Sequence, residues 1–362
     1  MLSENIWCVV MAGGSGTRFW PISTTKVPKQ FVPVQGTGRT FIQNTVARFD
    51  GLIPLERTIV VTNRKYASMV RENLPDLPQE NILEEPYNRD TAPCVAYAMY
   101  TILKRDPKAF MIVVPCDHMI IEEEKFRSMI EFVSKDLQQY DALVTIGVKP
   151  TRPDTNYGYI QADGFPQDNT PIKVKTFTEK PDPELAKVFV ASGEFLWNSG
   201  IFLWKASTIK AEFERHLPRM VQLFEGWEVA LDTPAADQFI EKVYADVQKI
   251  SIDYGIMERT DLAWAYPASI GWYDIGTWES LYSFFPGKDA NGNAVYADAK
   301  VVQNSRGNTL ITTSKGKMLA VCDLENYTVV DTDKVLMICP RDDKRYREFI
   351  SNLLMPGNED YR

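Results

Sequence analysis

The chain of 362 residues is poor in the residues that mark metal, redox and membrane proteins. It has only two histidines, and its five cysteines include no Cys-x-x-Cys pair, which argues against a zinc or dithiol site. No apolar run approaches the roughly 18 residues that span a bilayer. The apolar run near the N-terminus, Ile6 to Ala12, follows Glu4 rather than lysines, unlike a secretory signal. We therefore expect a cytoplasmic protein with reduced thiols and no membrane partner.

Basic residues are also scarcer than acidic ones: 40 against 48 gives a net charge of −8 and a pI of about 5.1. This balance argues against a general nucleic-acid binder, which needs an excess of cations. It does not exclude a binder of small polyphosphates, because the charge of one loop can oppose the average. Hydrophobic residues make up 44% of the chain, enough for a large core, and the length suggests about two domains.

Short apolar runs alternate with helical patterns through the first half of the chain. The predicted strands are Ile6–Met11, Thr58–Thr62, Phe110–Pro115 and Ala142–Val148, and the predicted helices are Thr40–Phe49, Arg64–Leu74, Thr91–Leu103 and Lys125–Tyr140. The alternation predicts an α/β fold with a mixed, mostly parallel sheet and helices on both faces. Such sheets bind ligands at the carboxyl ends of their strands.

The second half of the chain has a different pattern of predicted strands, helices and turns. Strand-like runs at Gly158–Ala162 and Lys173–Phe177 precede helical stretches near 184–191, 207–215 and 236–246. After residue 286, Asn, Asp and Gly separate short β-branched runs, and an amphipathic pattern over Asp343–Leu354 predicts a final helix. The runs are Val301–Val302, Leu310–Thr313, Tyr327–Val330 and Val335–Ile338. We predict two domains, 1–285 and 286–362, the second a small β domain in which short strands form a coil.

A glycine-rich segment follows the first predicted strand. It fits neither the P-loop, which needs Gly-Lys followed by Ser or Thr, nor the dinucleotide fingerprint, because Phe19 replaces the third glycine. From Gly13 to Gln30 there are three cations, Arg18, Lys26 and Lys29, and no acidic residue. Glycines let backbone N–H groups approach a polyphosphate, and the cations neutralise it. The segment is either a phosphate-binding loop or an ordinary surface turn.

The sequence GGSGTRFWPIS at Gly13–Ser23, followed by PKQF at Pro28–Phe31, resembles the signature of the sugar nucleotidylyltransferases, and within them the mannose-1-phosphate guanylyltransferases. The resemblance covers about residues 5–340 and implies a Rossmann-like catalytic domain with a left-handed β-helix type of C-terminal domain. It also implies that the loop holds a nucleoside triphosphate and that Arg18 and Lys29 are catalytic on its phosphates. The implied nucleotide-binding residues of the loop are Ala12, Gly13, Gly14, Gly16 and Thr17.

Two aspartates are candidates for binding a metal. Asp117 directly follows the predicted strand Phe110–Pro115, where it could equally cap a helix. Asp274 lies between glycines and aromatic residues in Gly271–Trp278, where it could be an ordinary turn residue. The resemblance implies that both carboxylates bind Mg²⁺, an ion that needs only one or two carboxylates besides phosphate oxygens.

Three further segments resemble the family's sugar-phosphate site. Glu179-Lys180 lies in the motif Phe177–Pro181; by itself it would be a solvated pair. The resemblance implies that Lys180 is catalytic and holds the sugar phosphate while Glu179 accepts from sugar hydroxyls. In the same way, Gly158 permits close backbone approach, and the side-chain amide of Asn198 binds hydroxyls. Without the family, both residues would belong to turns beside strands.

The segment Glu85–Pro93 resembles the family's base-recognition stretch, which ends in Arg-Asn-Thr-Ala-Pro. Arg89, Asp90 and Thr91 are the implied nucleotide-binding residues, although Asp90 or Thr91 can also cap the helix that follows. Asp90 stands where asparagine is commoner, and a carboxylate accepts hydrogen bonds but cannot donate them.

The implied reaction joins GTP and mannose 1-phosphate to give GDP-mannose and pyrophosphate, by in-line attack of the sugar phosphate on the α-phosphorus. Guanylyl transfer to another sugar 1-phosphate, such as a heptose, is one alternative. A non-catalytic subunit that binds a nucleotide sugar is another. The C-terminal β domain, whose short strands leave edges to cover, is a candidate surface for a homodimer.

Overall fold

The structure is a computed structural model that describes residues 5–14, 16, 19–33, 38–137, 139–285, 287–297, 300–313, 317–341, 346 and 348–350. The chain forms two compact units. Unit 1 comprises Met1–Gly14, Gln43–Cys116 and Ile120–Trp272, and unit 2 comprises Ser15–Ile42, Asp117–Met119 and Tyr273–Arg362. The glycine-rich segment therefore passes from unit 1 into unit 2 after Gly14.

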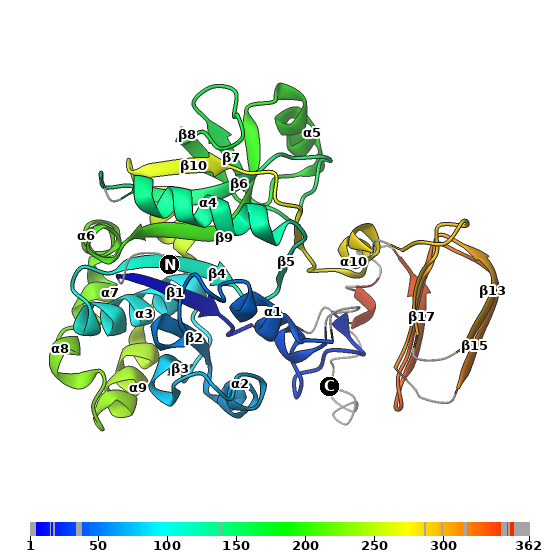
Figure 1. The fold of residues 1–362 in the computed structure, drawn as a ribbon, viewed down its shortest axis with the longest axis horizontal. Helices are drawn as coiled ribbons and strands as arrows, with labels where there is room; N and C mark the ends of the chain where they lie inside the picture. The colour runs from blue at the N-terminus through cyan, green and yellow to red at the C-terminus, as the bar shows by residue number, and fades with distance from the viewer. Residues whose placement is uncertain are drawn as a thin grey trace. The chain divides into compact units, whose positions relative to one another are not determined.

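The centre of unit 1 is a nine-stranded sheet in the order β3-β2-β1-β4-β9-β6-β10-β8-β7 (Figure 1). Its strands are β1 (Ile6–Met11), β2 (Thr58–Asn63), β3 (Ile82–Glu85), β4 (Phe110–Pro115), β6 (Leu143–Val148), β7 (Tyr159–Ala162), β8 (Ile172–Thr178), β9 (Phe195–Lys205) and β10 (Ala263–Pro267). A separate two-stranded sheet joins β5 (His118–Ile120) to β11 (Trp272–Asp274).

The large sheet is mixed, as predicted, but it is not mostly parallel. Strands β3, β2, β1 and β4 pair in parallel, and β6 pairs in parallel with β10. The long strand β9 runs antiparallel to β4, β6 and β7, and β8 runs antiparallel to β10 and β7. Antiparallel neighbours need no crossover helix, so the alternation of strands and helices in the first half of the chain does not predict how β7, β8 and β9 pair.

The helices are α1 (Phe41–Ala47), α2 (Ala67–Asn73), α3 (Thr91–Arg105), α4 (Glu123–Asp136), α5 (Pro183–Ser192), α6 (Ala206–His216), α7 (Pro218–Leu223), α8 (Trp227–Ala230), α9 (Ala236–Asp246) and α10 (Trp278–Phe284). Short 3₁₀ turns cover Lys29–Phe31, Leu55–Arg57, Arg64–Tyr66 and Gln79–Asn81, and a π-helix covers Asp253–Met257. Among the described residues, no helix has the length and apolar character needed to cross a membrane.

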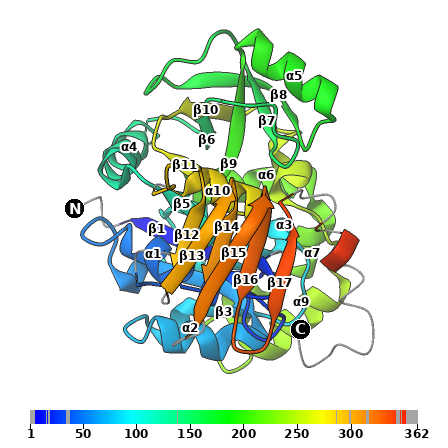
Figure 2. The same cartoon turned by 90° about the vertical axis from the view of Figure 1, so that its right-hand side faces the viewer.

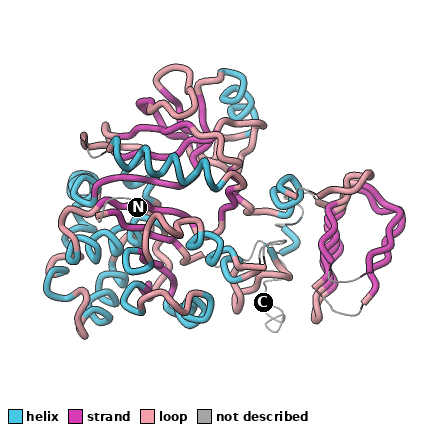
Figure 3. Tube along the Cα trace, viewed as in Figure 1, coloured by secondary structure: helices cyan, strands magenta, loops and turns pink. Residues whose placement is uncertain are grey.

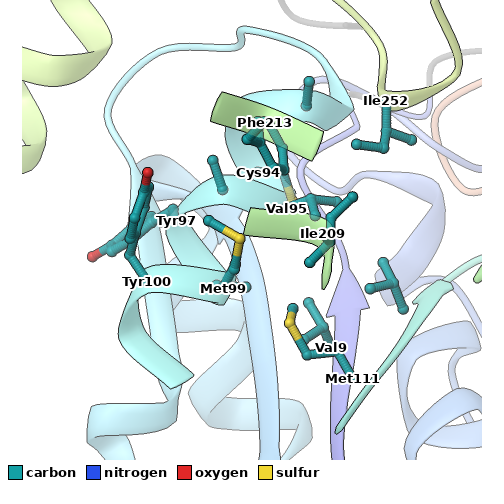
Figure 4. Packing of buried hydrophobic residues seen from close by; sticks show 14 of the residues in the cluster. Val9, Cys94, Val95, Tyr97, Met99, Tyr100, Met111, Ile209, Phe213 and Ile252 are labelled. Carbon is teal, nitrogen blue, oxygen red and sulfur yellow. The ribbon is translucent and has the colours of Figure 1, made fainter. Parts of the chain in front are cut away.

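The parallel strands β1, β2 and β4 of this sheet are buried on both faces, as is typical of parallel strands. Val9 of β1 and Met111 of β4 pack with residues of α3 and α6 on one face, where Figure 4 shows Val95, Ile209 and their neighbours. Cys8 points to the opposite face, where burial raises the pKa of its thiol and the nearby Arg48 guanidinium opposes that shift. Figure 3 shows the helices gathered around this sheet.

The C-terminal part of unit 2 is made of short strands: β12 (Ala294–Ala297), β13 (Lys300–Arg306), β14 (Thr309–Thr312), β15 (Met318–Glu325), β16 (Tyr327–Asp331) and β17 (Leu336–Pro340). Strands β12, β14 and β16 pair in parallel, as do β13 and β15, while β17 pairs antiparallel to β16. Successive strands therefore alternate between two sheets, and the parallel part of the region is a coil, as predicted (Figure 2).

A second core holds unit 2 together. Phe19 packs edge-to-face on Trp278 of α10, with 4.9 Å between ring centroids, in one cluster with Ile311 and Val330. Tyr346 donates from its hydroxyl to the carbonyl oxygen of Trp20 at 2.8 Å. The segment that follows the glycines is thus anchored on α10 and the C-terminal strands. Most of the predicted helix Asp343–Leu354 lies outside the described residues. The part of it that is described, Tyr346 and residues 348–350, is helical.

Candidate active site

Lys29 is the centre of a charged cluster in unit 2. Its ammonium lies 3.0 Å from Asp117 Oδ2 and donates a further hydrogen bond to the Asp117 carbonyl oxygen at 3.2 Å. The side chain is only 4% exposed and passes between the rings of Phe19 and Phe41, whose centroids lie 5.4 and 5.0 Å from Nζ. Lys29 is therefore a fixed charge, because an ion pair and two aromatic faces hold it.

His118 brings the two predicted metal carboxylates together. Its Nε2 lies 4.0 Å from Asp117 Oδ1 and 3.7 Å from Asp274 Oδ1. Burial alone would raise the pKa of Asp117, but the positive charges of Lys29 and His118, with hydrogen bonds, lower that pKa to about 2. Asp117 therefore lies beside two basic side chains, Lys29 and His118, and Asp274 lies beside one of them, His118. Sequence reasoning assigned His118 no role in the site.

These donors fit a magnesium ion better than a zinc ion. Within the described residues, no three His, Cys, Asp or Glu side chains form a complete metal-binding group. Zinc is held by three or four nitrogen or sulfur ligands, whereas Mg²⁺ needs one or two carboxylates and takes its other ligands from water and phosphate. Asp117 and Asp274 are the side chains that could supply this smaller set.

Two glycines of the loop lie against close neighbours. A Cβ on Gly16, whose φ is +58°, would lie 2.5 Å from the backbone nitrogen of Lys29. In unit 1, a Cβ on Gly13 would lie 2.7 Å from Glu85 Oε2, whereas a Cβ on Gly14 would meet no described atom within 4 Å. Thr17 and Arg18 lie outside the described residues, so their predicted roles stay predictions.

Glu85 ends strand β3 beside Gly13, and sequence reasoning assigned it no role of its own. It is 5% exposed, and its Oε1 accepts a hydrogen bond from the Tyr244 hydroxyl at 2.9 Å. Burial raises the pKa of Glu85 to about 7, although the bond from Tyr244 opposes the shift. A carboxylate at the end of a buried strand is the signal that could have identified it.

The predicted base-recognition residues all make structural contacts. Arg89 donates to the carbonyl oxygens of Tyr244 and Ala245 at the end of α9, at 2.9 and 2.8 Å. Asp90, with a φ of +71°, precedes α3 and accepts from the Thr91 backbone N–H at 2.9 Å. Thr91 Oγ1 accepts from the Ile252 backbone N–H at 2.8 Å. The helix-capping alternative for Asp90 is thus observed, and the segment is held rigidly at the start of α3.

The predicted sugar-phosphate residues form one cluster in unit 1. Lys180, with a φ of +49°, donates to Glu179 Oε1. A Cβ on Gly158 would overlap Glu179 Oε2 and would lie 3.5 Å from the Cβ of Asn198. Gly158, Glu179 and Asn198 therefore converge, and only glycine leaves room for the carboxylate at that position.

Asn198 uses its amide within the protein. Its Oδ1 accepts from Thr145 Oγ1 at 3.0 Å and from the Gly200 backbone N–H at 3.1 Å. Its Nδ2 donates to Asp253 Oδ1 at 2.7 Å, which brings Asp253 into the cluster. Sequence reasoning missed Asp253, and no local pattern marks it, because it lies far along the chain from the other members.

Comparison with known proteins shows the class to which the chain belongs. The family model described as nucleotidyl transferase matches residues 7–289, so the chain is a member of that family and an enzyme of the nucleotidyltransferase class. The resemblance seen in the glycine-rich segment is thereby confirmed.

Three proteins similar to this chain have more specific names. The mannose-1-phosphate guanylyltransferase of Escherichia coli K12 is 32% identical and aligns with 100% of this chain and 76% of its own length. The alginate biosynthesis protein AlgA of Pseudomonas aeruginosa is 34% identical over 92% of this chain and 69% of its own. Among solved structures, mannose-1-phosphate geranyltransferase from Thermus thermophilus has a TM-score of 0.83 at 29% identity, covering 97% of this chain and all of that one.

Proposed function

We propose that the protein transfers GMP from GTP to α-mannose 1-phosphate, giving GDP-mannose and pyrophosphate. A phosphate oxygen of the sugar phosphate forms a bond to the α-phosphorus of GTP. The bond from that phosphorus to the oxygen bridging to the β-phosphorus breaks, and pyrophosphate leaves. The names of two relatives at 32% identity, both mannose-1-phosphate guanylyltransferases by name, support the choice of substrates, and the chain's own residues support the chemistry.

The observation that carries the proposal is the cluster of Lys29, Asp117, His118 and Asp274. The attacking group is already an anion, so the reaction needs positioning and charge neutralisation rather than a protein nucleophile. Lys29 supplies a charge that its surroundings hold in place, and we assign Arg18 to the same triphosphate. Asp117 and Asp274 would hold Mg²⁺, which, when bound, neutralises phosphate oxygens of the substrate.

Glu85 supports guanine as the base. Tyr244 occupies its Oε1, and its Oε2 lies beside the backbone of Gly13 in the glycine-rich segment. Guanine presents two neighbouring N–H donors, at N1 and N2, which a carboxylate accepts in its ionised form. Arg89, Asp90 and Thr91 then serve mainly to hold the segment, consistent with an aspartate in place of asparagine at position 90.

In unit 1, Lys180 is assigned to the phosphate of the sugar substrate and Glu179 to its hydroxyls. The Lys180 side chain is 56% exposed, and an exposed pair with a neighbouring glutamate holds a lysine only weakly. The ammonium can therefore leave Glu179 for a phosphate at little cost. Gly158 keeps the backbone close to the sugar.

We also propose that the coil of β12–β16 is a left-handed β-helix, that residues 1–285 and 286–362 act as separate domains, and that the C-terminal strands form a homodimer surface. The parallel pairing of alternate strands supports the first proposal. Size-exclusion chromatography with light scattering tests the last, and a monomer at micromolar concentration would contradict it.

A pyrophosphate-release assay over a grid of nucleoside triphosphates and sugar 1-phosphates, with Mg²⁺, tests the function. We expect the highest kcat/KM for GTP with mannose 1-phosphate. A higher kcat/KM with a heptose or another hexose 1-phosphate would show that mannose 1-phosphate is not the preferred sugar substrate. A higher kcat/KM with another triphosphate would show that GTP is not the preferred nucleotide. Absence of release from every pair would contradict the proposal.

A further inference from the structure

Asp253 opens the π-helix Asp253–Met257 in unit 1. Single π-helical turns are rare and occur often at functional sites, because the wider turn re-aims the side chains at its ends. The last three residues of the turn, Gly255, Ile256 and Met257, are buried, and a Cβ on Gly255 would lie 3.0 Å from Leu217. Asp253 is therefore a polar side chain at the end of a fixed turn.

The Asp253 carboxylate faces the cluster around Gly158. Its Oδ1 accepts from Asn198 Nδ2 at 2.7 Å, and its Oδ2 accepts no hydrogen bond from another described side chain. Burial, and then the negative charge of Glu179, raise the pKa of Asp253 to about 6. Glu179 lies against Gly158, Asn198 lies beside the same glycine, and Asn198 binds Asp253, so both carboxylates belong to one cluster, in which Lys180 pairs with Glu179.

The backbone next to Asp253 is tied to the base-recognition segment. The N–H of Ile252 donates to Thr91 Oγ1 at 2.8 Å, and the N–H of Ile250 donates to the Arg89 carbonyl oxygen at 3.2 Å. The Ala92 N–H donates in turn to the Ile250 carbonyl oxygen at 3.1 Å. These hydrogen bonds hold the backbone just before the π-helix and so fix the position of Asp253. Its carboxylate therefore needs little reorganisation to bind a ligand.

We propose that Asp253 is a specificity-determining residue that accepts a hydrogen bond from one hydroxyl of the sugar substrate, with Asn198 as the residue that positions it. The inference rests on the proposed function. Carboxylate oxygens only accept hydrogen bonds, and sugar hydroxyls are donors that the carboxylates of Glu179 and Asp253 can bind. Both ends of the Asn198 amide already make hydrogen bonds within the protein, so the role we assign to Asn198 is to orient Asp253.

The test pairs Asp253→Asn with a series of substrates. Asparagine keeps an oxygen that can accept from Asn198, so the variant retains the fold while losing the charge. We expect kcat/KM for mannose 1-phosphate to fall roughly 10- to 100-fold, mostly through KM, with KM for GTP changed less than about 2-fold. Asp246→Asn, an exposed carboxylate at the end of α9, is the matched control and should leave both constants unchanged.

Monodeoxy analogues of mannose 1-phosphate identify the contact. In the wild type, removing the hydroxyl that Asp253 binds should lower kcat/KM by about the same factor as the Asp253→Asn substitution lowers it for mannose 1-phosphate. With Asp253→Asn, that one analogue should be turned over nearly as well as mannose 1-phosphate itself, while the others keep their penalties. If every analogue keeps its full penalty in the variant, Asp253 binds no hydroxyl and the inference is overturned.

The two proposals fail in different ways. Absence of wild-type turnover with GTP and mannose 1-phosphate would overturn the proposed function. An active wild type whose Asp253→Asn variant has unchanged KM for the sugar phosphate would overturn only the role of Asp253. A variant that loses turnover with KM unchanged for both substrates would also overturn it, because a specificity contact acts through binding.

Discussion

Two lysine–carboxylate pairs assigned to substrate phosphates are built in opposite ways. Lys29 and Asp117 meet across 88 positions of sequence, and the lysine is 4% exposed between two aromatic rings. Lys180 and Glu179 are adjacent in sequence, and the lysine is 56% exposed. The first pair is held by the folding of unit 2, whereas the second depends only on neighbours along the chain.

The difference separates two uses of a positive charge. A lysine that the surrounding structure holds is preorganised and contributes most where charge develops during reaction. A lysine on an exposed pair contributes little to stability and is free to turn toward an incoming phosphate. We therefore expect Lys29 to act on kcat and Lys180 on KM, and the substitutions below test that division.

The carboxylates of the cluster around Lys29 should give the largest effects. Asp117→Ala and Asp274→Ala each remove one of the two predicted metal ligands. We expect kcat to fall on the order of 100-fold or more, the scale of removing one charge-stabilising group. Steady-state pyrophosphate release measures the effect, with the exposed Asp333→Ala of the same unit as control. Turnover near that of the wild type in either variant would exclude the metal assignment.

Lys29→Met tests the fixed charge. Methionine keeps an unbranched stem between Phe19 and Phe41 but has no ammonium, and Asp117, with its side chain 36% exposed, can be solvated by water. We expect kcat to fall roughly 10- to 100-fold while the melting temperature changes little. Lys26→Met, an exposed lysine of the same loop, is the matched control. A large loss of stability without a loss of kcat would make Lys29 structural.

Lys180→Ala tests the exposed charge and should have a smaller effect. We expect KM for the sugar phosphate to rise roughly 10-fold, with kcat and the melting temperature nearly unchanged. Lys187→Ala removes a lysine from a similar exposed pair, with Glu184 on α5, and should change neither constant. An increase confined to KM for GTP would show that the triphosphate and sugar-phosphate assignments are reversed.

The sequence predicted elements where one local pattern was enough. Strands β1 and β4 have the predicted bounds, and α3 begins at Thr91 as predicted. Strand β9 was not predicted as one strand, because Asn198 and Gly200 interrupt its apolar pattern. Its antiparallel position between β4 and β6 is a long-range pairing that no local pattern encodes.

The site shows the same limit. Motifs named Lys29, Asp117 and Asp274 individually, but the contact of Lys29 with Asp117 and the place of His118 depend on packing within unit 2. The anchoring of the segment after Gly14 in unit 2 is equally non-local, since it rests on Phe19 against Trp278. Asp253 was missed because no local pattern distinguishes it from surface acids, whereas the position of Glu85 at the end of a buried strand was a signal that went unused.

Glu85 extends the comparison to a buried carboxyl that pairs with no lysine among the residues that the structure describes. Asp117, beside Lys29, has a pKa of about 2, whereas burial raises the pKa of Glu85 from 4.5 to about 7. Between pH 4.5 and 7 the folded protein therefore binds a proton at Glu85 that the unfolded chain has released. The contribution of Glu85 to stability falls as the pH rises through this window.

Glu85→Gln should remove that dependence. Glutamine mimics the protonated carboxyl and can still accept from Tyr244, so at pH 8 the variant avoids the cost of a buried charge. We expect its melting temperature to exceed that of the wild type by roughly 2–6 °C at pH 8 and to match it at pH 4.5. Differential scanning calorimetry across this range, with the exposed Glu80→Gln as control, measures the difference. An equal offset at both pH values would mean that Glu85 does not titrate there, and that a carboxyl in this fold needs no lysine to stay ionised.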